Sequence, residues 1–238
     1  MDRLLVALDV DTAAEARALA DRLRGAVGGF KIGSRLFTSH GPSIVEEFVA
    51  RGDRVFLDLK LHDIPHTVAG AVAAATRLDV WMVTVHASGG AAMLRAAREA
   101  ADQEAARMSR RAPLVIAVTV LTSLGQEMLG DIGVPGAITA QVGRLAALTQ
   151  AAGLDGVVAS PQEIALIRAK CGPSFAVVTP GIRSADAARG DQSRTMSAPE
   201  ALAAGASYLV VGRPIIADPD PRAAAERIAA QCRASLIR

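Results

Sequence analysis

The sequence predicts one (β/α)8 barrel, a TIM barrel, that spans residues 1–238 as a single domain. Short apolar runs alternate with stretches rich in Ala, Arg and Glu along the whole chain, and each kind occurs eight times. This alternation predicts a parallel sheet whose strands are joined by helices. An open, doubly wound sheet is the rival architecture. Eight repeats in 238 residues fit the closed barrel better, because such barrels run to about 250 residues.

The expected strands are nearly continuous apolar runs, as is typical of strands that are covered on both faces. Taken in order, they are residues 4–8, 29–33, 55–60, 80–85, 114–120, 156–159, 175–178 and 208–211. No linker or low-complexity segment separates them, so no domain boundary is expected.

The expected helices follow the strands one by one. They cover residues 12–23, 42–50, 65–76, 91–108, 138–152, 162–169, 199–204 and 222–233. Thr12, with Glu15 three residues later, forms a candidate capping box, and Pro65 suits the first turn of a helix. Two connections, residues 122–137 and 184–198, are long, and long loops in compact domains are often lids.

The composition argues against several classes of protein. The formal net charge is +2 and aromatic residues make up 3% of the chain, so no nucleic-acid or membrane surface is expected. The apolar run at residues 4–8 is too short for a signal peptide or a membrane span. Cys171 and Cys232 form no C-x-x-C motif, which favours a reduced, cytoplasmic protein. The histidines lack metal-ligand spacing, so no metal site is expected.

The most informative stretch is residues 58–67, which read Asp-Leu-Lys-Leu-His-Asp-Ile-Pro-His-Thr. Asp58 and Lys60 are two residues apart, so they project from the same face of a strand. Asp63 follows where the strand should give way to a turn. Opposite charges at a strand's end are costly to desolvate unless a ligand or a network needs them. A structural ion pair remains the alternative for an isolated D-x-K pattern.

Polar residues occur where nearly every expected strand ends, and in a barrel the chemistry belongs at these carboxyl ends. At or just after these ends are Asp9, Asp58, Lys60, His86, Thr122, Ser123 and Ser160, and the second strand carries Lys31. One polar strand end would mean little, because strand ends are often polar for solvation alone. Acidic and basic groups on three successive strands favour a catalytic cluster.

The last two strands carry a second pattern. One ends in Thr-Pro-Gly-Ile-Arg at residues 179–183, and the other in Val-Gly-Arg-Pro at residues 211–214. The loops after these strands are the usual phosphate site of the fold. Glycine lets backbone N–H groups approach an anion, and arginine offers a planar fork to phosphate oxygens. The alternative is that the glycines are turn residues and the arginines are surface charges.

Seven motifs, in order along the chain, resemble those of the orotidine 5'-monophosphate decarboxylase family in its bacterial, single-function form. They lie at residues 6–9, 30–33, 58–67, 120–123, 179–183, 191–192 and 211–214. The resemblance implies that orotidine 5'-monophosphate (OMP) loses CO₂ to become UMP, the last step of de novo pyrimidine nucleotide synthesis. It implies no metal and no organic cofactor.

The resemblance also implies roles for four charged residues. Lys60 would be the cation beside C6 of the pyrimidine and the proton donor to it. Asp58 would lie near the departing carboxylate and keep Lys60 charged. Lys31 would hold Asp58 and contact the ribose, and Asp9 would bind the ribose hydroxyls.

The remaining implied contacts lie on the pyrimidine, the phosphate and a partner subunit. Thr122 and Ser123 would sit near the pyrimidine edge. Further substrate contacts would come from Ile64, Pro180, Arg183, Gln192, Gly212 and Arg213, of which Arg183, Gln192, Gly212 and Arg213 would grip the phosphate. Asp63 and Thr67 would reach across a homodimer interface into the neighbouring site.

Three other readings stay open. A metal-dependent sugar-phosphate decarboxylase or aldolase barrel shares the D-x-K-x-x-D pattern, but Thr122-Ser123 and the Gln192/Arg213 pair favour the nucleotide enzyme. A catalytically silent phosphate-binding barrel would not need Lys60. A nucleic-acid-binding role has only the isoelectric point of about 8.8 in its favour.

Overall fold

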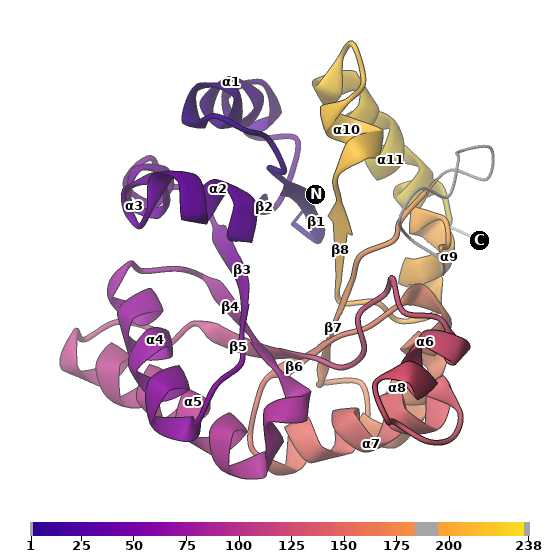
Figure 1. Ribbon diagram of the computed structural model, residues 1–238. Helices are drawn as coiled ribbons and strands as arrows, with labels where there is room; N and C mark the ends of the chain where they lie inside the picture. The colour runs from indigo at the N-terminus through magenta and orange to yellow at the C-terminus, as the bar shows by residue number, and fades with distance from the viewer. Residues whose placement is uncertain (1, 184–194, 236–238) are drawn as a thin grey trace.

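The computed structural model describes residues 2–183 and 195–235, and it confirms the predicted barrel. Eight parallel strands follow one another around the barrel, and the last pairs with the first. Figure 1 shows the helices as an outer ring around these strands. The strands are β1 (Leu4–Ala7), β2 (Gly29–Gly33), β3 (Val55–Leu61), β4 (Met82–His86), β5 (Leu114–Val118), β6 (Gly156–Val158), β7 (Ala176–Thr179) and β8 (Tyr208–Val211).

The eight predicted helices are present, and their ends lie within two residues of the predicted ones. They are α1 (Ala13–Leu23), α3 (Ser43–Ala50), α4 (Pro65–Arg77), α5 (Gly90–Arg107), α7 (Ile138–Ala151), α8 (Ile164–Cys171), α9 (Ala198–Ala203) and α11 (Pro221–Ser235). Thr12 and Glu15 form the predicted capping box at the start of α1, and Pro65 is the first residue of α4.

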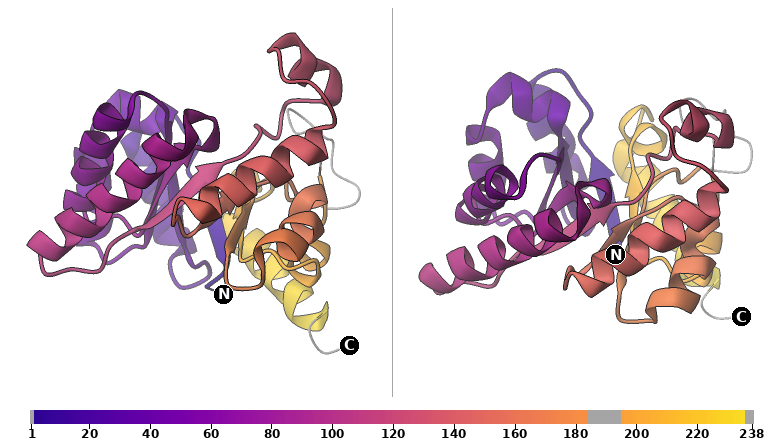
Figure 2. Two further views of the ribbon diagram at one scale, coloured as in Figure 1. Left: turned by 90° about the horizontal axis from the view of Figure 1, so that it is seen from below. Right: turned by 60° about the horizontal axis from the view of Figure 1, so that its bottom comes forward.

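The structure adds helical segments that the sequence did not predict. They are α2 (Ser34–His40), α6 (Gln126–Asp131), α10 (Arg213–Ile216) and the 3-10 turns η1 (Ala87–Gly89) and η2 (Pro161–Glu163). The connection of residues 122–137 is therefore not a plain loop, because it contains α6. Figure 2 shows α6 projecting beyond the neighbouring helices. The other long connection lies mostly at residues 184–194, outside the described residues.

Apolar side chains form two layers, one inside the barrel and one between the barrel and its helices. The inner cluster contains Leu5, Ala7, Phe56, Met82, Ile116, Val178 and Val210. The larger outer cluster takes the alternate strand positions, such as Leu4 and Val6 on β1. Both faces of each strand are thus covered, which explains the nearly continuous apolar runs.

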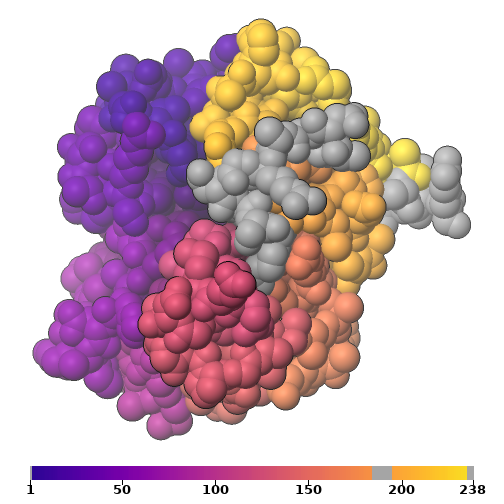
Figure 3. Space-filling view, turned by 45° about the vertical axis from the view of Figure 1, so that its right-hand side comes forward, coloured from indigo at the N-terminus to yellow at the C-terminus, as the bar shows by residue number. Residues whose placement is uncertain are grey.

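Closure of the barrel places the first and last strands side by side. Leu5 of β1 pairs with Val210 of β8, and Figure 3 shows the first and last parts of the chain, indigo and yellow, side by side on the surface. At the amino ends of the strands, Trp81 packs edge-on against Tyr208, with ring centroids 5.0 Å apart. None of the helices in the described ranges combines the length and the hydrophobicity that crossing a membrane requires.

Candidate active site

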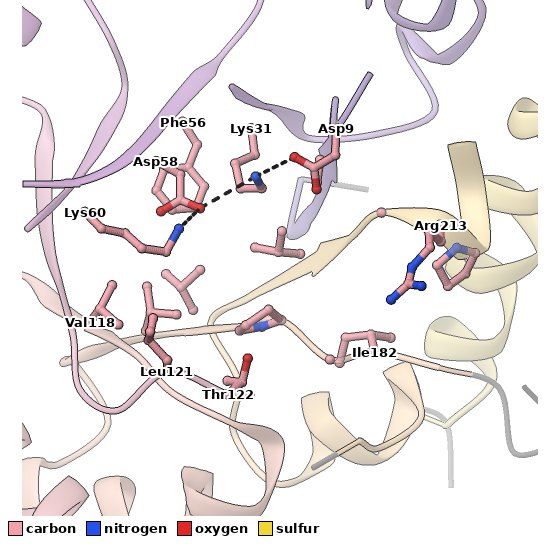
Figure 4. A pocket seen from close by; sticks show the side chains of 18 of the residues that line it. Asp9, Lys31, Phe56, Asp58, Lys60, Val118, Leu121, Thr122, Ile182 and Arg213 are labelled. Atoms are coloured by element: carbon pink, nitrogen blue, oxygen red, sulfur yellow. Dashed lines mark hydrogen bonds and ion pairs between the residues drawn. The ribbon is translucent and has the colours of Figure 1, made fainter. Parts of the chain in front are cut away.

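A cavity of about 490 Å³ opens at the carboxyl ends of the strands. Figure 4 shows charged side chains along one side of it and apolar side chains opposite. It is lined by Ala7, Asp9, Lys31, Arg35, Phe56, Asp58, Lys60, Val118, Val120, Leu121, Thr122, Val158, Val178, Pro180, Gly181, Ile182, Arg183, Val210, Gly212, Arg213, Pro214 and Ile216. Every strand except β4 therefore contributes to this cavity, either directly or through the segment that follows it.

Four charged residues, alternately acidic and basic, form a row along one side of the cavity. Lys31 Nζ lies 3.1 Å from Asp9 Oδ1 and 3.6 Å from Asp58 Oδ2. Lys60 Nζ lies 2.9 Å from the same Asp58 oxygen. The row follows from topology, because β1, β2 and β3 are neighbours and their carboxyl ends meet at one rim.

The row passes from the protein interior toward solvent at both ends. The side chains of Lys31 and Asp58 are each 11% exposed, whereas Lys60 is 37% and Asp9 is 53% exposed. Gly33 makes room for the Lys31–Asp9 pair, since a Cβ there would lie 3.0 Å from Lys31 Nζ. A side chain at position 33 would therefore require the Lys31 ammonium to shift by a few tenths of an ångström.

Asp58 is held as a carboxylate despite its burial. Burial is the largest influence on its pKa and raises it, but the charges of Lys31 and Lys60 and hydrogen bonds from Lys60 and Thr84 together keep the pKa below its ordinary value. Because Asp58 stays ionised, Lys60 faces a permanent negative charge.

The backbone of β3 departs from regular strand geometry at the charged residues. Between Leu57 and Leu61 the register with β4 shifts, and Lys60 has a φ of 53°. This left-handed conformation is unfavourable for a residue with a Cβ. Simple alternation therefore does not explain why both Asp58 and Lys60 reach the cavity, although both do so as predicted.

The opposite wall of the cavity is apolar. Val118, Val158 and Val178 line it; Val178 belongs to the inner apolar cluster, and Val158 packs against that cluster. Phe56 also lines the cavity, but it lies beside Asp58 on β3, on the charged side (Figure 4). Leu121 and Thr122 continue this wall at the end of β5 (Figure 4). The cavity thus places an apolar surface opposite the charged row.

Two arginines mark the end of the cavity that β7 and β8 form. Arg183 follows β7, and Arg213 is the first residue of α10, directly after β8. Gly181 has a φ of 79°, which a residue without a Cβ adopts without strain. Pro180 and Gly212 also line this end. The structure thus brings the predicted phosphate-binding residues of these two loops together.

Some predicted site residues do not line the cavity of their own chain. Asp63, Ile64 and Thr67 are exposed, and Ile64 exposes 66% of its surface. Asp63 Oδ1 accepts a hydrogen bond from the Ile64 N–H. Ser123 is also exposed and outside the lining, although Thr122 beside it takes part. Gln192 lies outside the described residues.

Sequence reasoning missed Arg35 and the apolar wall. Arg35 lines the cavity from α2 and forms an ion pair with Asp11. Its helix was not predicted, so nothing indicated that it would face the strand ends. The apolar wall residues occur in runs that read equally well as plain barrel core. Within residues 2–183 and 195–235, no group of three or more His, Cys, Asp and Glu side chains is placed to hold a metal ion.

Comparison with known proteins gives a consistent match along the chain. The family model for the orotidine 5'-phosphate decarboxylase / HUMPS family matches residues 2–228. A protein of Moorella thermoacetica, named orotidine 5'-phosphate decarboxylase, is 56% identical over 231 residues, which cover 97% of this chain and 92% of that protein. A protein of the same name from Syntrophotalea carbinolica is 50% identical over 234 residues, with 98% and 96% covered.

Solved structures show the same likeness in three dimensions. The crystal structure of orotidine 5'-phosphate decarboxylase from Lactobacillus acidophilus has a TM-score of 0.87 at 33% identity, covering 98% of this chain and 99% of that one. An uncharacterized conserved protein from Geobacillus kaustophilus has a TM-score of 0.85 at 35% identity, with 96% and 99% covered. The likeness therefore extends over nearly the whole chain.

Proposed function

Since the chain belongs to the orotidine 5'-phosphate decarboxylase / HUMPS family, we propose that its cavity binds OMP and releases UMP and CO₂. This reaction is the last step of de novo pyrimidine nucleotide synthesis. The observation that carries the proposal is the Asp9–Lys31–Asp58–Lys60 row beside an apolar wall. A charged row next to an apolar wall suits a substrate with a charged reacting group and a flat ring.

The reaction breaks one bond and makes one. The bond between C6 of the pyrimidine and its carboxylate breaks, the electron pair stays on C6, and CO₂ leaves. A proton then passes from Lys60 Nζ to C6, which gives UMP, and solvent restores the proton to Lys60. The carbanion has no obvious electron sink, so the fixed positive charge of Lys60 stabilises it.

The choice of lysine at this position supports the proton transfer. Lys31, Lys60 and Lys170 are the lysines of the chain, and the remaining basic side chains apart from histidine are arginines. An arginine would supply positive charge but does not give up a proton in proteins, whereas a lysine does. Two of the three lysines line the cavity, which favours a site that needs a transferable proton.

Asp58 and Lys31 prepare Lys60 for this step. Asp58 Oδ2 lies 2.9 Å from Lys60 Nζ, so its negative charge attracts the Lys60 ammonium and holds it at the cavity. Lys31 offsets the cost of burying that carboxylate. The substrate carboxylate would lie near Asp58 and leave as neutral CO₂, while Lys31 and Asp9 would contact the ribose.

The β7 and β8 end of the cavity would bind the phosphate, and Thr122 would contact the pyrimidine edge. Arg183 and Arg213 offer guanidinium groups there, with Pro180 and Gly212 beside them. Gln192, predicted from the sequence, would add a contact. Phosphate binding far from C6 supplies free energy that can be used to close the site over the reacting ring.

A partner subunit would complete the site. Asp63, Ile64 and Thr67 are exposed and lie outside their own cavity, which suits residues that reach into a neighbouring site. In such a homodimer, Asp63 of one chain would extend the charged row of the other. Ser123 would stay near the pyrimidine of its own chain.

The direct test is to mix the purified protein with OMP and follow the loss of orotate absorbance. We expect turnover that an added chelator leaves unchanged. Turnover that a chelator abolishes, or activity on a sugar phosphate instead of OMP, would favour the metal-dependent barrel that shares the D-x-K-x-x-D pattern. No turnover on either substrate would favour a silent phosphate-binding barrel.

A further inference from the structure

The shifted register between β3 and β4 leaves the backbone of Lys60 in need of a new hydrogen-bond partner. Leu57 pairs with Val83 and Leu61 with Val85. Four residues along β3 therefore span the same length as two residues along β4, and the regular backbone hydrogen bonds between the two strands are interrupted there. The left-handed φ of Lys60 lies inside this interval. Some contact must hold the interval in place, because its conformation is unfavourable by itself.

Thr84, between the two paired residues of β4, supplies that contact. Its Oγ1 lies 2.9 Å from the backbone N of Lys60 and 2.9 Å from Asp58 Oδ1. The backbone N–H can only donate, so the hydroxyl accepts there. An ionised carboxylate can only accept, so the hydroxyl donates its own O–H hydrogen bond to Asp58. Both hydrogen-bond directions are thus determined.

The two oxygens of Asp58 have different partners. Oδ2 faces Lys60 and Lys31, and Oδ1 faces Thr84. The hydroxyl therefore limits rotation of the carboxylate and keeps Oδ2 toward the two lysines. His86, two residues after Thr84 on β4, stacks on His62 and is the titratable side chain of this strand.

Water does not offer a replacement for this hydroxyl. Thr84 has 0% exposure and is absent from the cavity lining. Loss of the hydroxyl would remove this partner from the part-buried Lys60 N–H and from the buried Asp58 Oδ1, which is unfavourable for both groups.

We propose that Thr84 is a positioning residue, whose hydroxyl holds the Asp58 carboxylate and the Lys60 backbone in the arrangement from which Lys60 delivers its proton. The inference rests on the proposed function. Thr84 does not touch the substrate, so it affects the chemical step more than substrate binding.

The test compares Thr84→Val and Thr84→Ala, which remove the hydroxyl, with Thr84→Ser, which keeps it. The alanine variant covers the case in which valine prevents folding. Thr149→Val is the matched control, because Thr149 is also 0% exposed and its hydroxyl bonds to a backbone carbonyl in α7, outside the cavity. Each variant is assayed for kcat and KM with OMP and for UMP affinity.

We expect kcat to fall about 10- to 100-fold in Thr84→Val and Thr84→Ala, which corresponds to about 1.4–2.7 kcal/mol of barrier. KM and UMP affinity should change by less than roughly threefold, because the ribose and phosphate contacts remain. Thr84→Ser and Thr149→Val should keep kcat near the wild-type value.

Several results would overturn the inference. One is a wild-type kcat in Thr84→Val and Thr84→Ala. Another is a kcat in Thr84→Ser that is as low as in Thr84→Val. A third is a loss of kcat in Thr149→Val that equals the loss in Thr84→Val. Absence of OMP turnover in the wild-type enzyme would overturn the proposed function, and this inference with it. If the wild-type enzyme turns over OMP and Thr84→Val is equally active, the inference about Thr84 is wrong and the proposed function stands.

Discussion

Replacing Lys31 with methionine should destabilise the protein in a way that depends on pH. At the 3.6 Å between Lys31 Nζ and Asp58 Oδ2, two unit charges attract by about 4–5 kcal/mol at an effective dielectric constant of about 20. Removing one partner of a buried ion pair costs about 3–5 kcal/mol. Because Lys60 still faces Asp58 in Lys31→Met, we expect a loss of about 2–3 kcal/mol in the free energy of unfolding at pH 7.5.

The pH dependence follows from the pKa of Asp58. In the wild-type protein this pKa lies below its ordinary value, so the carboxylate stabilises the fold above about pH 4 and loses this effect as the pH falls through the folded-state pKa. In Lys31→Met, one of the charges that oppose the effect of burial is gone, so the pKa of Asp58 should rise. Protonation of Asp58 in mild acid would then remove its buried charge. The difference in unfolding free energy between wild type and Lys31→Met should therefore shrink toward pH 5.

Urea unfolding at pH 7.5 and pH 5, at one protein concentration, measures this difference. The single tryptophan, Trp81, reports unfolding because it packs on Tyr208 at the amino ends of the strands, away from the mutation. Lys170→Met, on the exposed side of α8, is the matched control and should stay within about 0.5 kcal/mol of wild type. The reasoning would be refuted if Lys31→Met lost no more unfolding free energy than this control, or lost the same amount at both pH values.

Three further predictions concern the reaction. Lys60→Ala should abolish decarboxylation of OMP without unfolding the protein, since one side chain supplies both the cation and the proton; turnover near the wild-type rate would contradict the assignment. Arg213→Ala should weaken OMP binding and lower kcat/KM, and added guanidinium should restore part of the loss. The corresponding loss of binding free energy should be at most about 2–5 kcal/mol, judged from truncated charge pairs at interfaces. Unchanged affinity for both OMP and UMP would place the phosphate elsewhere. Inactive Lys60→Ala and Asp63→Ala proteins, mixed so that subunits exchange, should recover up to about a quarter of wild-type activity, because a mixed dimer has one intact site. No recovery despite demonstrated exchange would mean that Asp63 serves its own chain.

Much of the fold and of the charged row could be read from the sequence because barrel topology converts order along the chain into proximity. Asp9 follows the first apolar run, Lys31 lies within the second, and Asp58 lies toward the end of the third. In a parallel barrel these three runs become neighbouring strands with the same direction, so the closeness of the three side chains could be expected. The same reasoning brought Arg183 and Arg213 to one end of the cavity.

Arg35 could not be placed from the sequence. It lies on α2, a seven-residue helix that starts directly after β2 and is too short to show a clear helical period. Its position at the cavity depends on how closely the chain turns after Gly33. That turn is decided by packing against the barrel rim, for which the local residues carry no signal.

What the sequence determined by itself is the closed barrel and the charges at its strand ends, since each depends on short-range pattern and a general rule of topology. What only the tertiary structure decided is how β3 and β4 are aligned. Residues 57–61 alternate apolar and charged side chains, so the local pattern predicts a regular register and gives no sign of a shift. That alignment produces the register shift between Leu57 and Leu61 and the left-handed backbone of Lys60. It also produces the two hydrogen bonds of Thr84, to Lys60, 24 positions away, and to Asp58, 26 positions away. Contacts at such sequence separations exist only once the strands have packed.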